Sequence, residues 1–296
     1  MCLTESIEKG VVTNGFPLEA RSQKLVVSPG MKALLSGVMK FVGSVLFVGI
    51  ILFWSALNPT RAAEKAVFDS FDAKGVRIQY MVQGVGEPVV LIHGLHASAL
   101  TNWKAPGIMD LLSKQYQVIA LDLPGHGGSD KPDKEEAYGV QMVEDVVLLL
   151  DHLKIKKAHI VGYSLGGMIA LKFIAEHSDR ALSGTLGGMG WLREGGWLQE
   201  VWDKIPVREG NRTPAACINS MGKLALTEDA LKAIKTPMTI LVGDQDPVKK
   251  LYVIPLQQVR KDWSVIEIEG AGHLNCIVKK KFSEEIVKWL DKNSHS

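Results

Sequence analysis

Residues 159–167 read HIVGYSLGG, and Ser164 is the centre of a G-x-S-x-G pattern that runs from Gly162 to Gly166. An apolar run precedes the pattern directly, and a segment expected to be helical follows it. This context is typical of a sharp strand-to-helix turn that lifts the serine hydroxyl above the edge of a sheet. Glycine on both sides leaves room for the strand and the helix to cross closely. The helix N-terminus offers N–H groups to a developing negative charge, so the stretch predicts Ser164 as a nucleophile.

Two loops downstream carry the partners that a serine nucleophile needs. An unassisted serine reacts poorly and requires a base that a third group holds in place. Residues 241–247 (LVGDQDP) follow one apolar strand, and residues 270–273 (GAGH) follow another that ends near Ile268. We expect His273 to be the general base, and a carboxylate of the first loop to orient its imidazole. The chain order serine, acid, histidine is the one expected for a serine on this kind of turn.

The acid has two candidates, Asp244 and Asp246. Asp244 follows the apolar strand so closely that its carboxylate is expected to cap the backbone of the turn, a common role for aspartate. Asp246 lies farther into the loop, and we assign it as the acid that orients His273, with Asp244 as the alternative.

From Val67 onward, short apolar runs alternate with amphipathic segments. This alternation predicts an α/β fold in which a mostly parallel, eight-stranded sheet has helices on both faces. The first two strands are joined by residues 72–75 (DAKG) and should form an antiparallel hairpin. Helices are expected over residues 139–152, 165–177 and 279–291. The predicted strands are residues 67–71, 76–82, 88–93, 117–121, 159–162, 182–186, 238–242 and 264–268.

Residues 190–233 interrupt this alternation and are predicted to be a small helical lid inserted between two strands. Thr213 and Pro214 are predicted as an N-cap followed by proline at the first helical position. Thr227 is expected to begin a further short helix. Five apolar residues share one face of the first lid helix and are expected to pack the lid on the body: Trp197, Leu198, Val201, Trp202 and Ile205.

Residues 31–63 are predicted to be a signal peptide or a membrane anchor. Within them, residues 41–57 (FVGSVLFVGIILFWSAL) form an uncharged apolar run near the lower length limit for spanning a bilayer. Basic residues precede this run and favour translocation of everything that follows it, and Met31 begins a stretch that reads like the start of a secretory signal. Residues 1–30 are then a tail, expected to be disordered, and residues 64–296 are the α/β domain. Both alternatives predict an extracytoplasmic catalytic domain that is periplasmic, secreted or anchored to the membrane.

The composition excludes several classes of protein. A net charge of +2, from 34 basic and 32 acidic residues, gives no field that would attract nucleic acid, so no such partner is expected. Three cysteines are too few for a disulfide scaffold. Cys217 and Cys276 are expected to be buried thiols, with a disulfide between them as the alternative. His93 and His96 have a spacing compatible with metal ligands, but no acidic residue or cysteine accompanies them, so neither a metal nor another cofactor is expected.

A set of motifs in this order and spacing resembles the α/β-hydrolase superfamily, in particular its serine carboxylesterases: LIHG at 91–94, DLPGHGGS at 122–129, the turn around Ser164, GDQD at 243–246 and GH at 272–273. The resemblance extends from about Val67 to the C-terminus. It implies that Ser164, Asp246 and His273 are the nucleophile, the acid and the base. It also implies that the backbone N–H groups of Leu95 and Leu165 form an oxyanion hole, and that the 122–129 loop is held together by its own polar side chains.

The resemblance predicts a serine hydrolase that cleaves a small-molecule carboxylic ester through an acyl-enzyme intermediate. A serine at this position excludes haloalkane dehalogenase and epoxide hydrolase chemistry, which in this superfamily needs an aspartate. Lactonase, carbon–carbon bond hydrolase and amidase activities use the same three residues and are alternatives. A non-catalytic binding protein with this fold is an alternative from another class. The tryptophans of the lid favour short to medium acyl chains, and contact with a membrane is expected only through an uncleaved N-terminal segment.

Overall fold

The structure is a computed structural model that describes residues 65–205 and 213–294. The predictions made for residues 1–63, a tail followed by a signal peptide or an anchor, lie outside the described residues. In the described ranges, no helix combines the length and the apolar character that a bilayer crossing needs.

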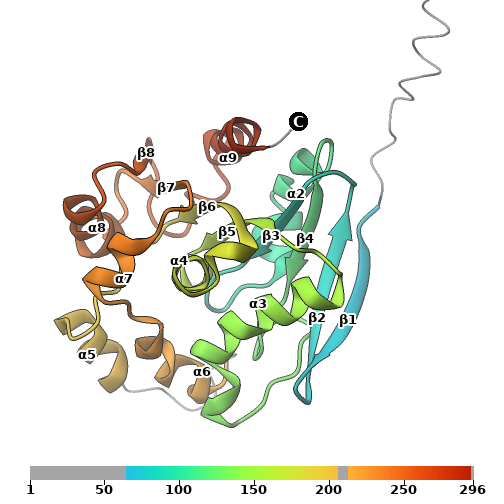
Figure 1. Ribbon diagram of the computed structural model, residues 1–296, viewed down its shortest axis with the longest axis horizontal. Helices are drawn as coiled ribbons and strands as arrows, with labels where there is room; N and C mark the ends of the chain where they lie inside the picture. The colour runs from blue at the N-terminus through green and yellow to red at the C-terminus, as the bar shows by residue number, and fades with distance from the viewer. Residues whose placement is uncertain (1–64, 206–212, 295–296) are drawn as a thin grey trace, which may run out of the picture. The chain divides into compact units, whose positions relative to one another are not determined.

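Eight strands of the described chain form one sheet in the order β1-β2-β4-β3-β5-β6-β7-β8 (Figure 1). β1 pairs antiparallel with β2, and β2 pairs antiparallel with β4, whereas the remaining neighbours are parallel. The predicted eight-stranded, mostly parallel sheet is therefore confirmed. The strands are β1 (Val67–Ala73), β2 (Val76–Gln83), β3 (Pro88–Ile92), β4 (Gln117–Leu121), β5 (Ala158–Tyr163), β6 (Ala181–Gly187), β7 (Met238–Gly243) and β8 (Ser264–Ile268).

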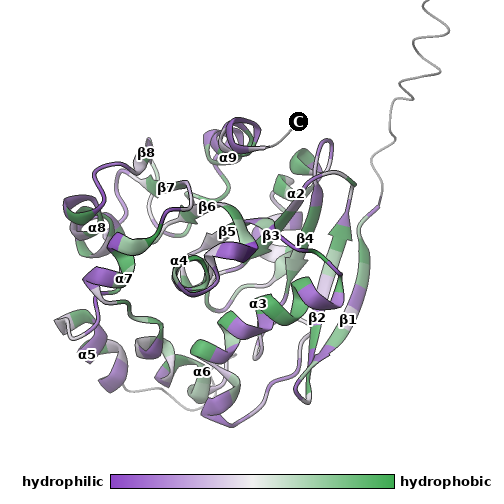
Figure 2. Ribbon diagram, viewed as in Figure 1, coloured by the Kyte–Doolittle hydropathy of each residue, from purple (hydrophilic) through white to green (hydrophobic). Residues whose placement is uncertain are grey.

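The central strands bury both of their faces, because successive side chains of a strand point to opposite sides of the sheet. In β3, Val90 and Ile92 join one hydrophobic cluster, whereas Val89 and Leu91 join the other. The first cluster includes residues of helices α3 (Val140–His152) and α4 (Leu165–Glu176). The second includes residues of α2 (Ile108–Leu112) and α9 (Lys280–Asn293), so helices cover both faces (Figure 1). Figure 2 shows the hydrophobic residues concentrated on the central strands and many hydrophilic residues on α9.

The helices agree with the three predicted from the sequence. Each of those three begins and ends within about two residues of its predicted bounds. The α-helices of the described ranges are α2 (Ile108–Leu112), α3 (Val140–His152), α4 (Leu165–Glu176), α5 (Trp197–Lys204), α6 (Ala215–Asn219), α7 (Glu228–Ala233), α8 (Ile254–Val259) and α9 (Lys280–Asn293).

The hairpin between β1 and β2 closes where the sequence predicts it. Ala73 pairs with Val76, which leaves Lys74 and Gly75 as the two residues of the turn. Their φ angles are 55° and 89°, and a two-residue turn with both φ values positive matches the twist of the flanking strands.

Helix α5 lies in the predicted lid segment, but only part of its apolar face is covered. Leu198 and Trp202 pack against the core, and the Trp202 indole N–H donates to the Tyr252 hydroxyl at 3.0 Å. Trp197 and Val201, by contrast, are 63% and 48% exposed. The prediction that the whole stripe packs on the body is therefore wrong, because the contact of this helix with the core is narrower than its apolar face.

The two predicted helix caps have different outcomes. Thr227 caps α7 as expected, since its hydroxyl accepts a hydrogen bond from the Ala230 N–H at 3.1 Å. The prediction for Thr213 is wrong: Pro214 itself is the N-cap residue of α6, and the Thr213 hydroxyl bonds to two histidine side chains instead. These distant partners outcompete the local backbone for the hydroxyl.

The two cysteines of the domain are buried free thiols, which confirms the favoured alternative. Burial raises the pKa of both Cys217 and Cys276 to about 12. A thiol with such a pKa is almost entirely protonated at neutral pH and is therefore a weak nucleophile.

The carboxyl group of Asp145 is buried inside the domain. Asp145 on α3 is 1% exposed, and its Oδ1 accepts a hydrogen bond from the Gln141 side chain at 2.9 Å. Burial raises the pKa of Asp145 to about 7, although the hydrogen bond from Gln141 opposes this shift. The native state therefore binds a proton here more tightly than the unfolded chain does. Asp145 consequently favours folding most at about pH 4 and below, and this contribution is lost as the pH rises towards 7.

We predict that Asp145→Asn stabilises the protein in a pH-dependent manner, because asparagine can accept the same hydrogen bond and never ionises. The free energy of unfolding should rise by on the order of 2–4 kcal/mol at pH 8 and change little at pH 4. Urea unfolding at both pH values measures this difference. The control is Asp151→Asn on the same helix, where the carboxylate is 58% exposed and pairs with Arg180; it should cost less than about 1 kcal/mol. An equal effect of Asp145→Asn at both pH values would contradict the prediction.

Candidate active site

Ser164 occupies the turn between β5 and α4. Its φ of 53° and ψ of −117° lie outside the regions that L-residues normally adopt. Hydrogen bonds hold this backbone in place: the Ser164 N–H donates to the Gly187 carbonyl at 2.8 Å, and the Ser164 carbonyl accepts from the Gly167 N–H at 2.8 Å. Such a conformation costs on the order of 1–3 kcal/mol and persists only where the surrounding structure imposes it.

The glycines on either side of Ser164 are needed for close packing. A Cβ atom at Gly162 would lie 1.9 Å from the Gly166 carbonyl oxygen, and one at Gly166 would lie 2.1 Å from the Ile92 carbonyl oxygen. The expectation that these glycines permit a tight crossing of strand and helix is confirmed.

The loops that follow β7 and β8 bring an acid and a histidine to Ser164. The His273 Nε2 atom lies 2.9 Å from the Ser164 Oγ atom, and its Nδ1 atom lies 2.9 Å from an Asp246 carboxylate oxygen. Asp246 is 3% exposed, and its other oxygen accepts a hydrogen bond from the Val248 N–H at 2.9 Å. The three residues named from the sequence therefore meet at one edge of the sheet.

Asp244 has a different environment from Asp246. Its carboxylate is exposed and accepts a hydrogen bond from the Ala271 N–H at 3.1 Å. Hydrogen bonds from the Ala271 and Gly270 backbone lower the pKa of Asp244. Asp244 thus links the loop after β7 to the loop after β8, whereas Asp246 contacts the imidazole.

The hydrogen bonds define which protons His273 carries. An ionised carboxylate only accepts hydrogen bonds, so the Nδ1 atom of His273 must carry a proton to bond to Asp246. In the neutral ring, the Nε2 atom then has a lone pair directed at the Ser164 hydroxyl, 2.9 Å away. This arrangement can take the proton of a serine hydroxyl that attacks an electrophile.

Tyr163 is a further contact of His273 that the sequence analysis does not include. Its ring stacks on the imidazole with centroids 5.8 Å apart and 30° between the planes, and its hydroxyl donates to the His273 backbone carbonyl. One side chain therefore holds both the ring and the backbone of His273. In the sequence, Tyr163 is distinguished only by its position inside the G-x-S-x-G pattern. Most residue types are compatible with the turn at this position, so the pattern does not predict the contact with His273.

The loop after β3 lies against the nucleophile. A Cβ atom at Gly94 would lie 3.2 Å from the Ser164 Cβ atom, and the Gly94 N–H donates to the Asn102 side chain at 2.9 Å. The backbone N–H groups of Leu95 and Leu165 have no acceptor in the part of the chain that the structure describes. Both are therefore available to bind a negatively charged oxygen near Ser164.

His93 stabilises this loop from inside the protein. It is fully buried; its Nδ1 atom lies 2.8 Å from the Gly94 carbonyl, and its Nε2 atom accepts from the Leu123 N–H at 3.0 Å. Burial lowers the pKa of His93 to about 4, so the ring is neutral at physiological pH. These bonds make His93 part of the hydrogen bonding that holds the loop after β3.

The 122–129 loop is held by its own polar side chains, as the resemblance implies. The Asp122 carboxylate accepts hydrogen bonds from the Ala99 and Gly128 N–H groups, each at 2.7 Å. The Ser129 hydroxyl donates to the Asp122 carbonyl at 2.6 Å. Asp122 therefore ties the loop after β4 to the segment that follows Leu95.

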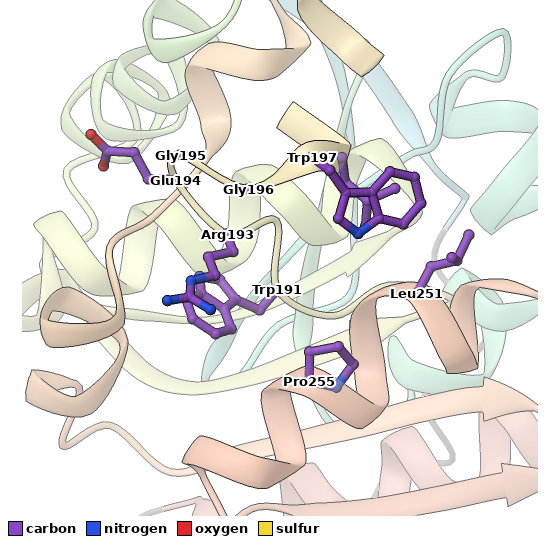
Figure 3. Close-up of a pocket in the computed structure, with 9 residues that line it drawn as sticks. Trp191, Arg193, Glu194, Gly195, Gly196, Trp197, Leu251 and Pro255 are labelled. Atoms are coloured by element: carbon purple, nitrogen blue, oxygen red, sulfur yellow. The ribbon is translucent and has the colours of Figure 1, made fainter. Parts of the chain in front are cut away.

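A cavity of about 320 Å³ opens beside α5. Trp191, Trp197, Leu251 and Pro255 give it apolar walls, and Arg193 is the cation at its margin (Figure 3). Figure 3 shows the Glu194 carboxylate pointing away from the space between Trp197 and Pro255. The surface beside α5 can therefore accept apolar groups.

Comparison with known proteins supports one fold family. The model of the α/β-hydrolase fold family matches residues 87–229. The chain is 38% identical over 122 residues to the dihydrolipoyllysine-residue acetyltransferase component of the acetoin cleaving system of Cupriavidus necator, a match that covers 41% of this chain and 32% of that protein. It is 32% identical over 193 residues to the 2-hydroxy-6-oxononadienedioate/2-hydroxy-6-oxononatrienedioate hydrolase of Comamonas testosteroni, over 64% of this chain and 62% of that protein. The chain thus spans less than two thirds of the length of either relative.

Solved structures agree on the fold. A carboxylesterase structure from Nitrososphaera gargenis superposes with a TM-score of 0.61 at 20% sequence identity, covering 76% of this chain and 98% of the other. At this level of identity the similarity concerns the fold alone.

We predict that the crossing at the nucleophile turn tolerates no side chain at Gly162. The Gly162→Ala substitution forces a Cβ atom onto backbone that cannot move aside, and it should lower the free energy of unfolding by about 3 kcal/mol or more. Thermal unfolding measures the loss. Gly272→Ala is the matched control, because a Cβ atom there meets nothing closer than the Asn275 side chain at 3.9 Å; it should shift stability by less than about 1 kcal/mol. Equal stability of the two variants would show that the crossing is looser than described.

Proposed function

Because the chain belongs to the α/β-hydrolase superfamily, we propose that it is a serine hydrolase with Ser164 as nucleophile, His273 as general base and Asp246 as the acid that orients it. The observation that carries this proposal is the pair of 2.9 Å contacts that link Ser164 to His273 and His273 to Asp246. The strained turn at Ser164 supports it, because strain in the backbone concentrates at functional sites.

In the proposed mechanism, the Ser164 oxygen attacks the carbonyl carbon of the substrate while the His273 Nε2 atom takes the hydroxyl proton. Asp246 stabilises the imidazolium that forms. The carbonyl oxygen becomes negative and accepts hydrogen bonds from the N–H groups of Leu95 and Leu165, a type of contact typically worth about 10²–10³ in rate per donor. Collapse of the adduct releases the alcohol, which takes the proton from His273. Water then attacks the acyl-enzyme with His273 again as base, and the acid product leaves.

We propose carboxylic esters of small molecules as the substrates. Ester cleavage needs no group beyond a nucleophile, a base and an oxyanion site, and the proposed residues supply all three. We propose short to medium acyl chains because the lid segment carries several tryptophans, among them Trp191 and Trp197. Initial rates with p-nitrophenyl esters of graded chain length would test this, and a rate maximum at long chains would contradict it.

Cleavage of a carbon–carbon bond next to a ketone is the second candidate. The relative from Comamonas testosteroni is named as a hydrolase of 2-hydroxy-6-oxo dienedioates, and the same catalytic residues would be used. Parallel assays with a 2-hydroxy-6-oxo-dienoate and with p-nitrophenyl butyrate distinguish the two. A kcat/KM at least tenfold higher for the dienoate would favour the second candidate.

The central test of the proposal is covalent labelling. A fluorophosphonate probe should label the folded protein once per chain, and Ser164→Ala should abolish the labelling while leaving the thermal midpoint within a few degrees. Folded wild-type protein that takes up no probe and turns over no ester would favour a non-catalytic binding protein with this fold.

The two acids should respond differently to the loss of charge. Asp246→Asn removes the carboxylate that fixes the His273 tautomer and should lower kcat by about 10³–10⁴. Asp244→Asn alters only a loop contact and should keep kcat within about threefold of wild type. Steady-state kinetics on an ester checks both variants. A larger loss in Asp244→Asn than in Asp246→Asn would reverse the proposed assignment.

We further propose that the catalytic domain works outside the cytoplasm, with residues 31–63 as a cleaved signal or a membrane anchor. The support is the apolar run at 41–57 and the basic residues before it. Fractionation of bacterial cells expressing the full chain, with N-terminal sequencing, tests the proposal. The protein should appear in the periplasm with an N-terminus near Ala63, or in the membrane with its domain open to external protease. An intact chain in the cytosol would overturn the proposal.

A further inference from the structure

The Thr213 hydroxyl connects the segment between β6 and β7 to the loop that follows β3. Thr213 is 1% exposed, and its Oγ1 atom lies 2.8 Å from the His96 Nδ1 atom and 3.2 Å from the His126 Nε2 atom. These three residues come from three separate parts of the chain: the loop after β3, the loop after β4, and the predicted lid segment. The contact is therefore a tertiary link, not a helix cap.

The direction of each hydrogen bond follows from His126. Its Nδ1 atom lies 2.9 Å from the Pro124 carbonyl oxygen, which only accepts, so Nδ1 carries a proton. The pKa of His126 is lowered to about 3, mainly by burial and to a smaller extent by the neighbouring His93. The ring is therefore neutral at physiological pH. The His126 Nε2 atom is then an acceptor, and the Thr213 hydroxyl donates to it. With its only proton used, the Thr213 oxygen accepts from the N–H of His96.

The Thr213 oxygen accepts this hydrogen bond from a strained part of the loop that follows β3. His96 has a φ of 62°, in the left-handed region that residues other than glycine rarely adopt. The Ala97 N–H donates to the Gly94 carbonyl at 3.2 Å and closes the turn that contains Leu95 and His96. The hydrogen bond from His96 to Thr213 fixes the side chain at the strained position of this turn. The same turn sets the direction of the Leu95 N–H.

We propose that Thr213 is a positioning residue that sets the oxyanion-binding geometry of the Leu95 N–H through His96. The proposal rests on the proposed serine hydrolase function. Thr213 touches neither the substrate nor Ser164 in this account. Its effect should appear when negative charge develops on the substrate oxygen, and much less when the neutral ester binds.

Three single variants and one double variant test the proposal. Thr213→Val keeps the shape of the side chain and removes the hydroxyl; it should lower kcat for a p-nitrophenyl ester about tenfold and leave KM within about threefold, since the interaction operates in the transition state. Thr213→Ser keeps the hydroxyl and should retain kcat within about threefold. His96→Ala removes the other partner of this hydrogen bond, at an exposed position, and should lower kcat by the same factor. The double variant of His96→Ala and Thr213→Val should lose no more kcat than either single variant, because the two residues act as one unit.

A trifluoromethyl ketone provides the readout that a purely structural role would not change. Addition of the Ser164 oxygen to its carbonyl carbon gives a tetrahedral adduct with a negative oxygen, so its Ki should rise in parallel with the fall in kcat/KM. The extent of fluorophosphonate labelling at long times should stay at one per chain in every variant, because Ser164, His273 and Asp246 are unchanged.

The outcomes separate the two proposals. If Thr213→Val and His96→Ala both keep kcat and Ki within twofold of the wild-type values, the proposed role of Thr213 is overturned. Labelling of the wild-type enzyme by the fluorophosphonate would still support the serine hydrolase proposal. An equal loss in Thr213→Ser and Thr213→Val would also overturn it, because the hydroxyl would then not be the determinant. Should Thr213→Val fail to fold, His96→Ala and Thr213→Ser decide. Wild-type protein without labelling or turnover would remove both proposals.

Discussion

The backbone of Ser164, with a φ of 53° and a ψ of −117°, is the constraint on which the geometry of the sheet edge depends. This conformation turns the chain from β5 into α4 within one residue and leaves the hydroxyl facing the neighbouring loops. The N–H of Ser164 bonds to Gly187 of the adjacent strand, and the absence of side chains at Gly162 and Gly166 lets the helix begin almost on top of the strand. The packing of three strands around the turn offsets the unfavourable free energy of this backbone conformation.

The order of the parallel strands explains how residues far apart in sequence meet at this turn. β5, β6, β7 and β8 are consecutive neighbours in the sheet, and the loops at the carboxyl ends of parallel strands meet on one edge. The loops after β7 and β8 approach so closely that a Cβ atom at Gly243 would lie 2.0 Å from the Ala271 carbonyl oxygen. Asp244 joins the same two loops, which leaves Asp246 facing His273.

Much of the fold and of the site can be predicted from the sequence, because the signals are local. Buried strands are continuous apolar runs, and the position of Ser164 between such a run and a helix indicates the turn. The choice of Asp246 over Asp244 uses only distance from the strand end. In the structure Asp246 contacts His273, whereas Asp244 accepts a hydrogen bond from Ala271 in the loop after β8. Contacts between side chains that are distant in the sequence could not be predicted in this way. Thr213 has the sequence of a helix cap, yet histidines from two other loops take its hydroxyl, and the exposure of Trp197 depends on how much of α5 the body covers.

A crystal structure of the protein after reaction with a fluorophosphonate tests the central claim most directly. We expect a phosphorus atom bonded to the Ser164 oxygen and a phosphonyl oxygen within about 3 Å of the Leu95 and Leu165 nitrogen atoms. His273 should remain bonded to Asp246. An adduct on another side chain, or one on Ser164 whose phosphonyl oxygen contacts neither N–H group, would contradict the account.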